Sequence, residues 1–288
     1  MTAKLPNLWI TFDFELGWGV VENQRWIVRE QSGVYERMTA QFAELLAGLE
    51  SLEVPVCWAT VGAMTQNQNQ YDFHFLPDGI RLKLEQFCKT SKETTRDGRR
   101  FIDALMASNY QKIVSHSYSH VVYTAGAVTE DQVRADLAKV GDILLALGGD
   151  PSIMVLPENK IPDLGLLKSA GVSSFRLPPK HSSGRISCIF EKIYSHPSAD
   201  KYTDDSTTFF PGSMLFKPRG DDVFSRRLFD LQISGLKQQL KRGVSQHIWL
   251  HPFNFGEYDF LYESFSEFVA WAANQREKRS LNIEAMGV

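Results

Sequence analysis

Six residues, Ser115-His116-Ser117-Tyr118-Ser119-His120, follow directly on the apolar pair Ile113-Val114. Such an apolar pair is typical of the end of a buried strand. Two imidazoles four residues apart point to the same side when they lie on one helical turn. That arrangement allows both rings to bind one metal ion, as in other His-x-x-x-His sites. The alternative is two surface histidines in a polar loop, so a third ligand, a base and an acid must be sought elsewhere in the chain.

A second polar stretch ends the first apolar run of the chain. Leu8-Trp9-Ile10-Thr11-Phe12 is rich in residues that favour β-structure and predicts a buried strand. It runs into Asp13-Phe14-Glu15, and residues two apart in a strand point to the same face. Two carboxylates that converge at a strand end are costly unless a cation or a proton lies between them. The alternative is a polar strand end whose acids are solvated.

Strands and helices alternate along most of the chain, as they do when parallel strands are joined by right-handed crossovers. Residues 64–98 break this pattern and are expected to form an irregular excursion. Residues 179–221 are expected to be loops, with Ile193-Tyr194 and Phe209-Phe210 as short strands. The other expected strands are 54–60, 111–114, 153–156, 172–175, 246–250 and 281–285, and the expected helices are 32–52, 99–107, 129–147, 163–170, 222–240 and 257–274.

Polar side chains of catalytic type collect where the expected strands end. In an α/β barrel the carboxyl ends of the strands carry the active site. Random placement on the surface would scatter such residues to both ends of the sheet, so their agreement favours a single site. The residues are Asp13 and Glu15 after the first strand, His116 and His120 after the third, Asn159 after the fourth, Arg176 after the fifth and His251 after a late strand.

Four stretches resemble motifs of the polysaccharide deacetylase family, also called the NodB-homology or carbohydrate esterase family 4 group. They are residues 11–15, 58–62, 115–120 and 249–252, and the His-x-x-x-His stretch is the most specific of them. The resemblance implies an α/β fold, a distorted (β/α) barrel of seven or eight mostly parallel strands, as one domain over residues 1–288. It also implies one divalent metal ion, commonly zinc, and hydrolytic removal of an N- or O-acyl group.

The resemblance assigns a role to each matched residue. Asp13 corresponds to the general base and His251 to the general acid, while Glu15, His116 and His120 correspond to the metal ligands. Two imidazoles and one carboxylate leave coordination positions open for water and a substrate carbonyl, so the set suits a catalytic ion.

The chain departs from the family pattern in two places. Many members have adjacent aspartates where this chain has Asp13-x-Glu15. Members also carry Arg-x-Pro after the fourth strand, where this chain reads Leu156-Pro157-Glu158-Asn159. Arg176-Leu177-Pro178, one strand later, matches the letters but not the position. Arg176 is therefore a candidate to orient Asp13 or, together with Asn159, to bind substrate; the alternative is a surface or structural arginine.

His251 is expected to project into the same mouth, because Pro252 ends its strand. A general acid must be protonated when the amine leaves, so a nearby carboxylate is expected to raise its pKa. Asp163, Asp200 and Asp205 are candidates by residue type alone.

Composition excludes several classes of protein. The 288 residues carry a net charge of -3 without a Lys/Arg block, which argues against nucleic acid as a partner. Three widely spaced cysteines indicate neither a disulfide framework nor a thiolate zinc site. No apolar run approaches the roughly 18 residues of a membrane span, and the N-terminus lacks an apolar signal region.

The missing signal region predicts a cytoplasmic protein, and the resemblance then implies an enzyme with a small or carrier-linked substrate. The expected substrate is an N-acetylated sugar attached to a nucleotide or lipid carrier. Deformylation of a formamido sugar and cleavage of a cyclic amide are the alternatives among hydrolases. A non-catalytic sugar-binding protein on the same scaffold is the alternative outside them, and the sequence carries no indication of oligomeric state.

Overall fold

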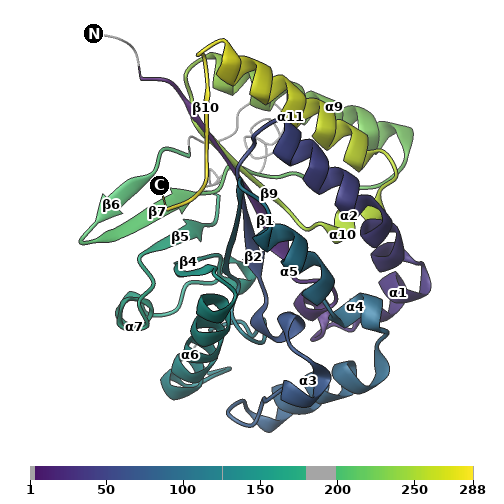
Figure 1. Ribbon diagram of the computed structural model, residues 1–288, viewed down its shortest axis with the longest axis vertical. Helices are drawn as coiled ribbons and strands as arrows, with labels where there is room; N and C mark the ends of the chain where they lie inside the picture. Colours follow the sequence, from purple (N-terminus) through teal and green to yellow (C-terminus); the bar gives the residue numbers. More distant parts are fainter. Residues whose placement is uncertain (1–3, 125, 180–198, 288) are drawn as a thin grey trace.

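The computed structural model describes residues 4–124, 126–179 and 199–287. The expected short strand Ile193-Tyr194 lies outside these ranges. Within them the chain forms one ten-stranded sheet (Figure 1). Its strands are β1 (Asn7–Phe14), β2 (Val56–Thr60), β3 (Gln111–Ser115), β4 (Asp150–Met154), β5 (Ser174–Leu177), β6 (Tyr202–Asp204), β7 (Thr207–Pro211), β8 (Met214–Leu215), β9 (Gln246–Leu250) and β10 (Asn282–Glu284).

The strand order is β6-β7-β5-β4-β3-β2-β1-β9-β8, and β10 pairs with β1 beside this path. Among the described residues only the β6–β7 pair is antiparallel. The eight strands from β7 to β8 along the path are therefore all parallel, which confirms the expected α/β fold with mostly parallel strands.

One continuous segment brings the two ends of this parallel array together. In residues 207–215, β7 pairs with β5 and β8 pairs with β9. Between them the Gly212 amide donates to the Leu177 carbonyl at 3.0 Å, and the Ser213 amide donates to the His247 carbonyl at 2.8 Å. The chain thus changes partner at Gly212 and Ser213, and the sheet curls into an incompletely closed barrel.

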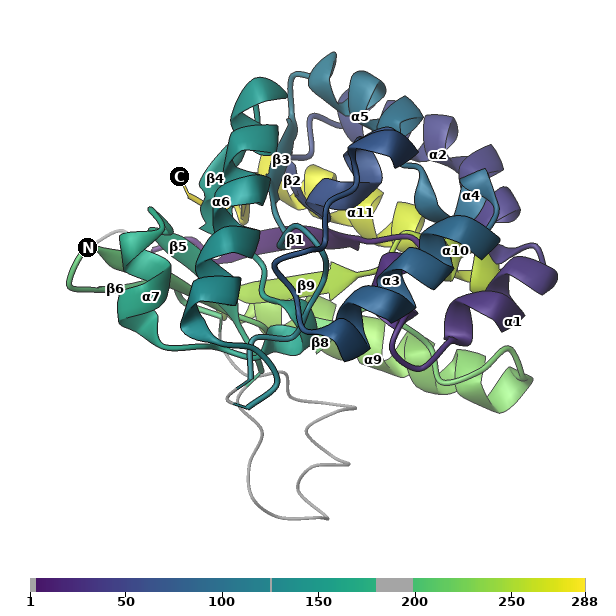
Figure 2. The same cartoon turned by 90° about the horizontal axis from the view of Figure 1, so that it is seen from below.

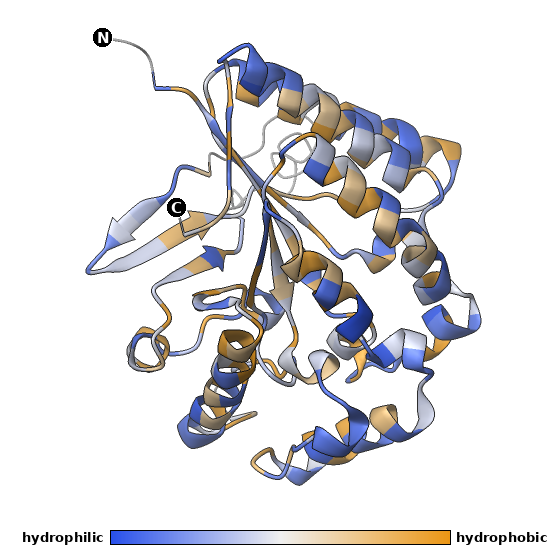
Figure 3. Cartoon of the chain, in the orientation of Figure 1, coloured by the Kyte–Doolittle hydropathy of each residue, from blue (hydrophilic) through white to orange (hydrophobic). Residues whose placement is uncertain are grey.

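Helices lie outside the strands (Figure 2), and each longer helix carries both hydrophobic and hydrophilic residues (Figure 3). In the described part of the chain, no helix has the length and apolar character needed to cross a bilayer. The α-helices are α1 (Arg25–Gln31), α2 (Val34–Ser51), α3 (Asp78–Thr90), α4 (Glu93–Arg96), α5 (Arg99–Met106), α6 (Glu130–Ala146), α7 (Leu164–Ser169), α9 (Val223–Lys241), α10 (Phe253–Glu257) and α11 (Leu261–Glu277).

Two expectations about the helices were wrong. The stretch expected to be irregular contains α3 and α4. In α3 only Leu84, Phe87 and Cys88 are buried among many polar residues, so its apolar pattern is sparse. The helix expected at 257–274 begins later, at Leu261, because Glu257 ends the short helix α10 and Tyr258 is extended.

The central strands form a rigid support for the residues at their ends. Every residue of β1 is buried. The ring of Phe12 packs edge-on against that of Trp58 with centroids 4.5 Å apart, and Phe14 packs against the same indole at 5.5 Å. Asp13 lies between these two anchored rings, so its backbone position is fixed by the core.

Candidate active site

Glu15 follows β1 directly and is buried, at 4% exposure. The chain turns back over it through a short 3-10 helix, Trp18–Val20. A Cβ atom at Gly19 would lie only 1.9 Å from Glu15 Oε1, so the backbone approaches this carboxylate more closely than any side chain would allow. The turn after β1 therefore fixes the carboxylate against its own backbone.

His116 and His120 lie in an irregular loop, and the expectation that they share a helical turn was wrong. The register between β3 and β4 shifts at Val114 and Ser115, just before the loop begins. Ser117 and His120 then adopt left-handed conformations, with φ of 66° and 58°. These turns bring the two imidazole centroids to 4.8 Å from each other without helical geometry.

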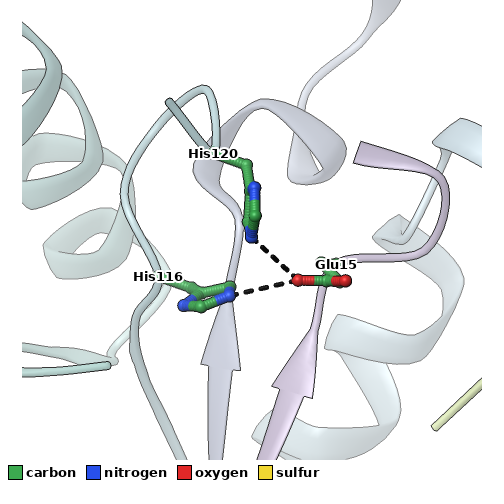
Figure 4. A group of neighbouring side chains, drawn as sticks. All are labelled: Glu15, His116 and His120. Carbon is green, nitrogen blue, oxygen red and sulfur yellow. Dashed lines mark hydrogen bonds and ion pairs between the residues drawn. The ribbon is translucent and has the colours of Figure 1, made fainter. Parts of the chain in front are cut away.

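The two imidazoles and Glu15 converge on one point (Figure 4). Glu15 Oε2 lies 3.2 Å from His116 Nε2 and 2.8 Å from His120 Nε2. Nδ1 of His116 lies 2.7 Å from the Val155 carbonyl, to which it donates, so its Nε2 carries the free lone pair. Three ligand atoms within 4.8 Å of one another fit a single metal ion, and this mixed nitrogen and oxygen set suits zinc.

A buried carboxylate on α6 accepts hydrogen bonds from the loop that carries the two histidines. Asp136 is 1% exposed and accepts hydrogen bonds from the backbone amides of Tyr118, at 2.8 Å, and Ser119, at 3.1 Å. The Tyr123 hydroxyl donates to it at 2.6 Å. Because the two amide bonds constrain the backbone between the two histidines, Asp136 fixes the spacing of the metal-ligand pair.

Asp13 forms a buried, two-pronged ion pair with Arg176. Arg176 Nη1 donates to Asp13 Oδ1 at 2.6 Å, and Nη2 donates to Oδ2 at 2.7 Å. Arg176 lies within β5 rather than after it, contrary to the expectation, and is 1% exposed. The parallel sheet thus brings a residue of β5 to the end of β1. This geometry favours orientation of Asp13 over direct contact with substrate as the role of Arg176.

Two further donors of Arg176 also have partners. Its Nη1 donates to Thr11 Oγ1 at 2.9 Å, and its Nε donates to Asn159 Oδ1 at 3.1 Å. Thr11 Oγ1 in turn lies 3.2 Å from Nε2 of the fully buried His247. Burial and the charge of Arg176 lower the pKa of His247 to about 3, so this ring is neutral and serves as a fixed polar support. Substrate binding by Asn159 stays a prediction.

Electrostatics keep both carboxylates of the site ionised. Burial alone would raise the pKa of Asp13, but the charge and hydrogen bonds of Arg176 outweigh it, and the pKa lies below the usual value. Burial likewise opposes ionisation of Glu15, whereas the charges of His251 and His120 hold its pKa well below the usual value. The site therefore holds two ionised carboxylates in a largely buried setting. The charge of Asp13 is balanced by Arg176, and that of Glu15 favours a cation bound between it and the two histidines.

His251 follows β9 and faces the same two carboxylates. Its Nε2 lies 3.9 Å from Asp13 Oδ2 and 3.5 Å from Glu15 Oε1, and its ring stacks on that of Phe253. Burial lowers the pKa of His251, and the two carboxylates offset this only in part. A proton on this ring is therefore given up readily.

Two expectations about His251 were wrong. Its pKa is lowered rather than raised, because burial dominates. The described carboxylates within 4 Å of its Nε2 are Asp13 and Glu15. The three acids suggested by type have other partners: Asp163 caps α7, Asp200 accepts from Ser245 and Asp205 pairs with Lys168.

Backbone strain is concentrated around the site. Ten non-glycine residues have positive φ in the described chain, and five of them lie here. Such conformations cost about 1–3 kcal/mol each and persist where the surroundings enforce them. The five are Leu16, Ser117, His120, Glu158 and Asn159.

Sequence reasoning missed Asp136 and His247, although each carries a signal. Asp136 falls on the apolar stripe of α6, beside Leu137 and between Val133 and Val140. An aspartate on the buried face of a helix requires dedicated partners. His247 lies in β9, a strand in which every residue is buried, and therefore also needs a partner. Both positions indicate a buried polar network, but not what it supports.

Comparison with known proteins finds similarity in structure alone. No family model matches the chain, and no curated protein matches it. A Mycobacterium smegmatis protein described as a polysaccharide deacetylase superposes with a TM-score of 0.62 at 14% identity, covering 99% of this chain and 92% of that one. The 4-alpha-glucanotransferase of Thermococcus litoralis superposes with a TM-score of 0.58 at 16% identity, and the match covers 98% of this chain but 40% of the enzyme.

A third solved structure links the two kinds of protein. A Parabacteroides distasonis protein described as a glycoside hydrolase/deacetylase gives a TM-score of 0.54 at 9% identity, covering 98% of this chain and 70% of that one. At such low identities these likenesses establish the fold, which is shared by deacetylases and glycoside hydrolases. The chemistry has to be argued from the residues of the site.

Proposed function

We propose that this protein is a single-domain, metal-dependent hydrolase that removes an acyl group, such as acetyl, from an amide nitrogen of a sugar or sugar-containing precursor. The observation that carries the proposal is the convergence of Glu15, His116 and His120 beside the Asp13–Arg176 pair and His251. The shared fold with a protein described as a polysaccharide deacetylase supports it.

Glu15, His116 and His120 would hold one divalent ion, and zinc is the ion proposed. Such an ion polarises a carbonyl and lowers the pKa of nearby water. The protein's own contribution is to orient the ligands. Val155 fixes the tautomer of His116, and Asp136 fixes the loop that carries both histidines.

Asp13 and His251 would move the protons of the reaction. Asp13, held in place by Arg176, accepts a proton from the water that attacks the carbonyl carbon. His251 donates a proton to the amide nitrogen as the carbon–nitrogen bond breaks. The products are a carboxylic acid and an amine, so one water molecule is consumed for each bond that is cleaved.

An acylated sugar on a nucleotide or lipid carrier, in the cytoplasm, is the proposed setting. The test is a panel assay for released acetate, formate and amine, with carrier-linked acetamido and formamido sugars, cyclic amides, chitin and peptidoglycan as substrates. Acetate and amine from the carrier-linked sugars support the proposal. Release of formate would identify a deformylase, and turnover of chitin or peptidoglycan alone would refute the proposed substrate.

We expect His251→Ala to retain the metal and the fold but to lose about 10²–10⁴-fold in kcat on an amide, the range of a general acid. The kcat on an activated ester should fall much less, because the leaving group of the ester needs no proton. Exposed His74 offers a matched control, and His74→Ala should leave both rates unchanged. Equal losses on the amide and the ester would mean that His251 serves another function, such as substrate binding.

A further inference from the structure

A pocket of about 250 Å³ adjoins the candidate metal site on the His120 side. Its buried walls come from Trp18, Val21, Leu84 and Val121. The walls thus combine the turn after β1, helix α3 and the residues just after His120. Since roughly 10–15 Å³ of such space suffices for one water molecule, the pocket holds far more than the methyl group of an acetyl.

Charged residues stand at the mouth of this pocket, while buried Ser119 and partly buried His120 add polar surface on the side of the candidate metal site. Glu22, Lys83 and Glu158 line it and are exposed, whereas the apolar walls are buried. An apolar group that enters the pocket therefore passes from water at the mouth to contact with the apolar walls inside.

The position of the pocket relative to His251 indicates which part of the substrate the pocket would hold. His251 faces Oε1 of Glu15, whereas His120 faces Oε2, so the two histidines approach this carboxylate at different oxygens. The leaving nitrogen has to lie within reach of His251. The pocket is lined by His120 and its neighbours Ser119 and Val121, so it is open to the other substituent of the carbonyl carbon, the acyl chain.

Resting on the proposed function, we infer that the preferred acyl group is larger than acetyl: an apolar chain of several carbons, or an aromatic ring, seated in the pocket between α3 and the His120 loop. Hydrolysis still consumes one water molecule and yields the free amine, but the acid released is a longer carboxylic acid.

Binding of acyl hydroxamates to the zinc-loaded protein tests this without relying on turnover. Each hydroxamate attaches to the metal by the same head group, and the series acetyl, butyryl, hexanoyl and benzoyl changes the acyl part alone. Each CH₂ buried in an apolar site tightens binding about fourfold. We expect hexanohydroxamate to bind at least about tenfold more tightly than acetohydroxamate in calorimetry, even if only half of its added carbons are buried.

Two substitutions on α3 test whether the tighter binding of longer acyl chains arises in the pocket. Ile80 lines the pocket, whereas Leu82 is 56% exposed and does not line it. Ile80→Trp should remove the advantage of the longer chain and leave acetohydroxamate binding unchanged. Leu82→Trp, the matched control, should change neither.

The outcomes separate this inference from the proposed function. Equal affinity across the series in the wild-type protein overturns the acyl pocket but leaves a working metal site. A longer-chain preference that Ile80→Trp does not affect also overturns it. Failure of every hydroxamate to bind the zinc-loaded protein overturns the proposed function and the inference together.

Discussion

Asp13→Asn is expected to retain the metal ion and to lose about 10²–10⁴-fold in kcat, the range typical of a general base. The amide keeps the size of the side chain but cannot accept a proton from water. Asp13 is not one of the three residues that converge as ligands, and its two oxygens point to Arg176. The measurement is kcat together with the zinc content of the same preparation.

Two further variants complete this test. Glu15→Gln should lose metal affinity, because Glu15 supplies the carboxylate of the ligand set. Asp72→Asn removes a partly exposed carboxylate that pairs with Lys139 and should leave both readouts unchanged. If Asp13→Asn loses the metal and Glu15→Gln retains it, the roles of the two carboxylates are the reverse of those proposed.

Arg176→Met is expected to lower the free energy of unfolding by about 3–5 kcal/mol, the cost of leaving a buried charge without its partner. Arg176 is 1% exposed and Asp13 is 5% exposed, so water cannot replace the guanidinium. Without Arg176, burial alone should raise the pKa of Asp13. Denaturant unfolding measures the loss directly.

Arg226→Met is a suitable control for Arg176→Met. Arg226 lies 4.0 Å from Glu263, and both side chains are more than half exposed, so the loss should stay within about 0–1 kcal/mol. The double variant Asp13→Leu/Arg176→Met removes both buried charges and should recover part of the stability but none of the activity. A loss for Arg176→Met no larger than that for Arg226→Met would contradict a structural role for the ion pair.

Much of the fold could be predicted because its signals are local. Apolar runs of strand length alternate with amphipathic helices, and this pattern alone indicates parallel strands joined by crossovers. Helix α3 escaped prediction because its buried residues are few and widely spaced. The change of partner at Gly212 and Ser213 also escaped prediction, since it depends on how far the whole sheet curls.

The three residues that converge as possible metal ligands could be predicted, but their geometry could not. Spacing indicated the histidine pair, and the family resemblance added Glu15 as the third ligand. The histidine loop, however, is turned by left-handed residues rather than by a helix. The partner of Asp13 could not be settled from sequence, because Arg176 lies on another strand and its reach depends on the packing of β5. Partners for buried polar groups are chosen by tertiary structure, which local patterns do not encode.

Metal content tests the central claim most directly. After reconstitution and removal of loosely bound ions, elemental analysis of the wild-type protein should give one zinc ion per chain. His116→Ala and His120→Ala should each lose it, whereas His74→Ala, at an exposed position, should retain it. A correctly folded protein that binds no zinc, cobalt or nickel stoichiometrically would contradict the account.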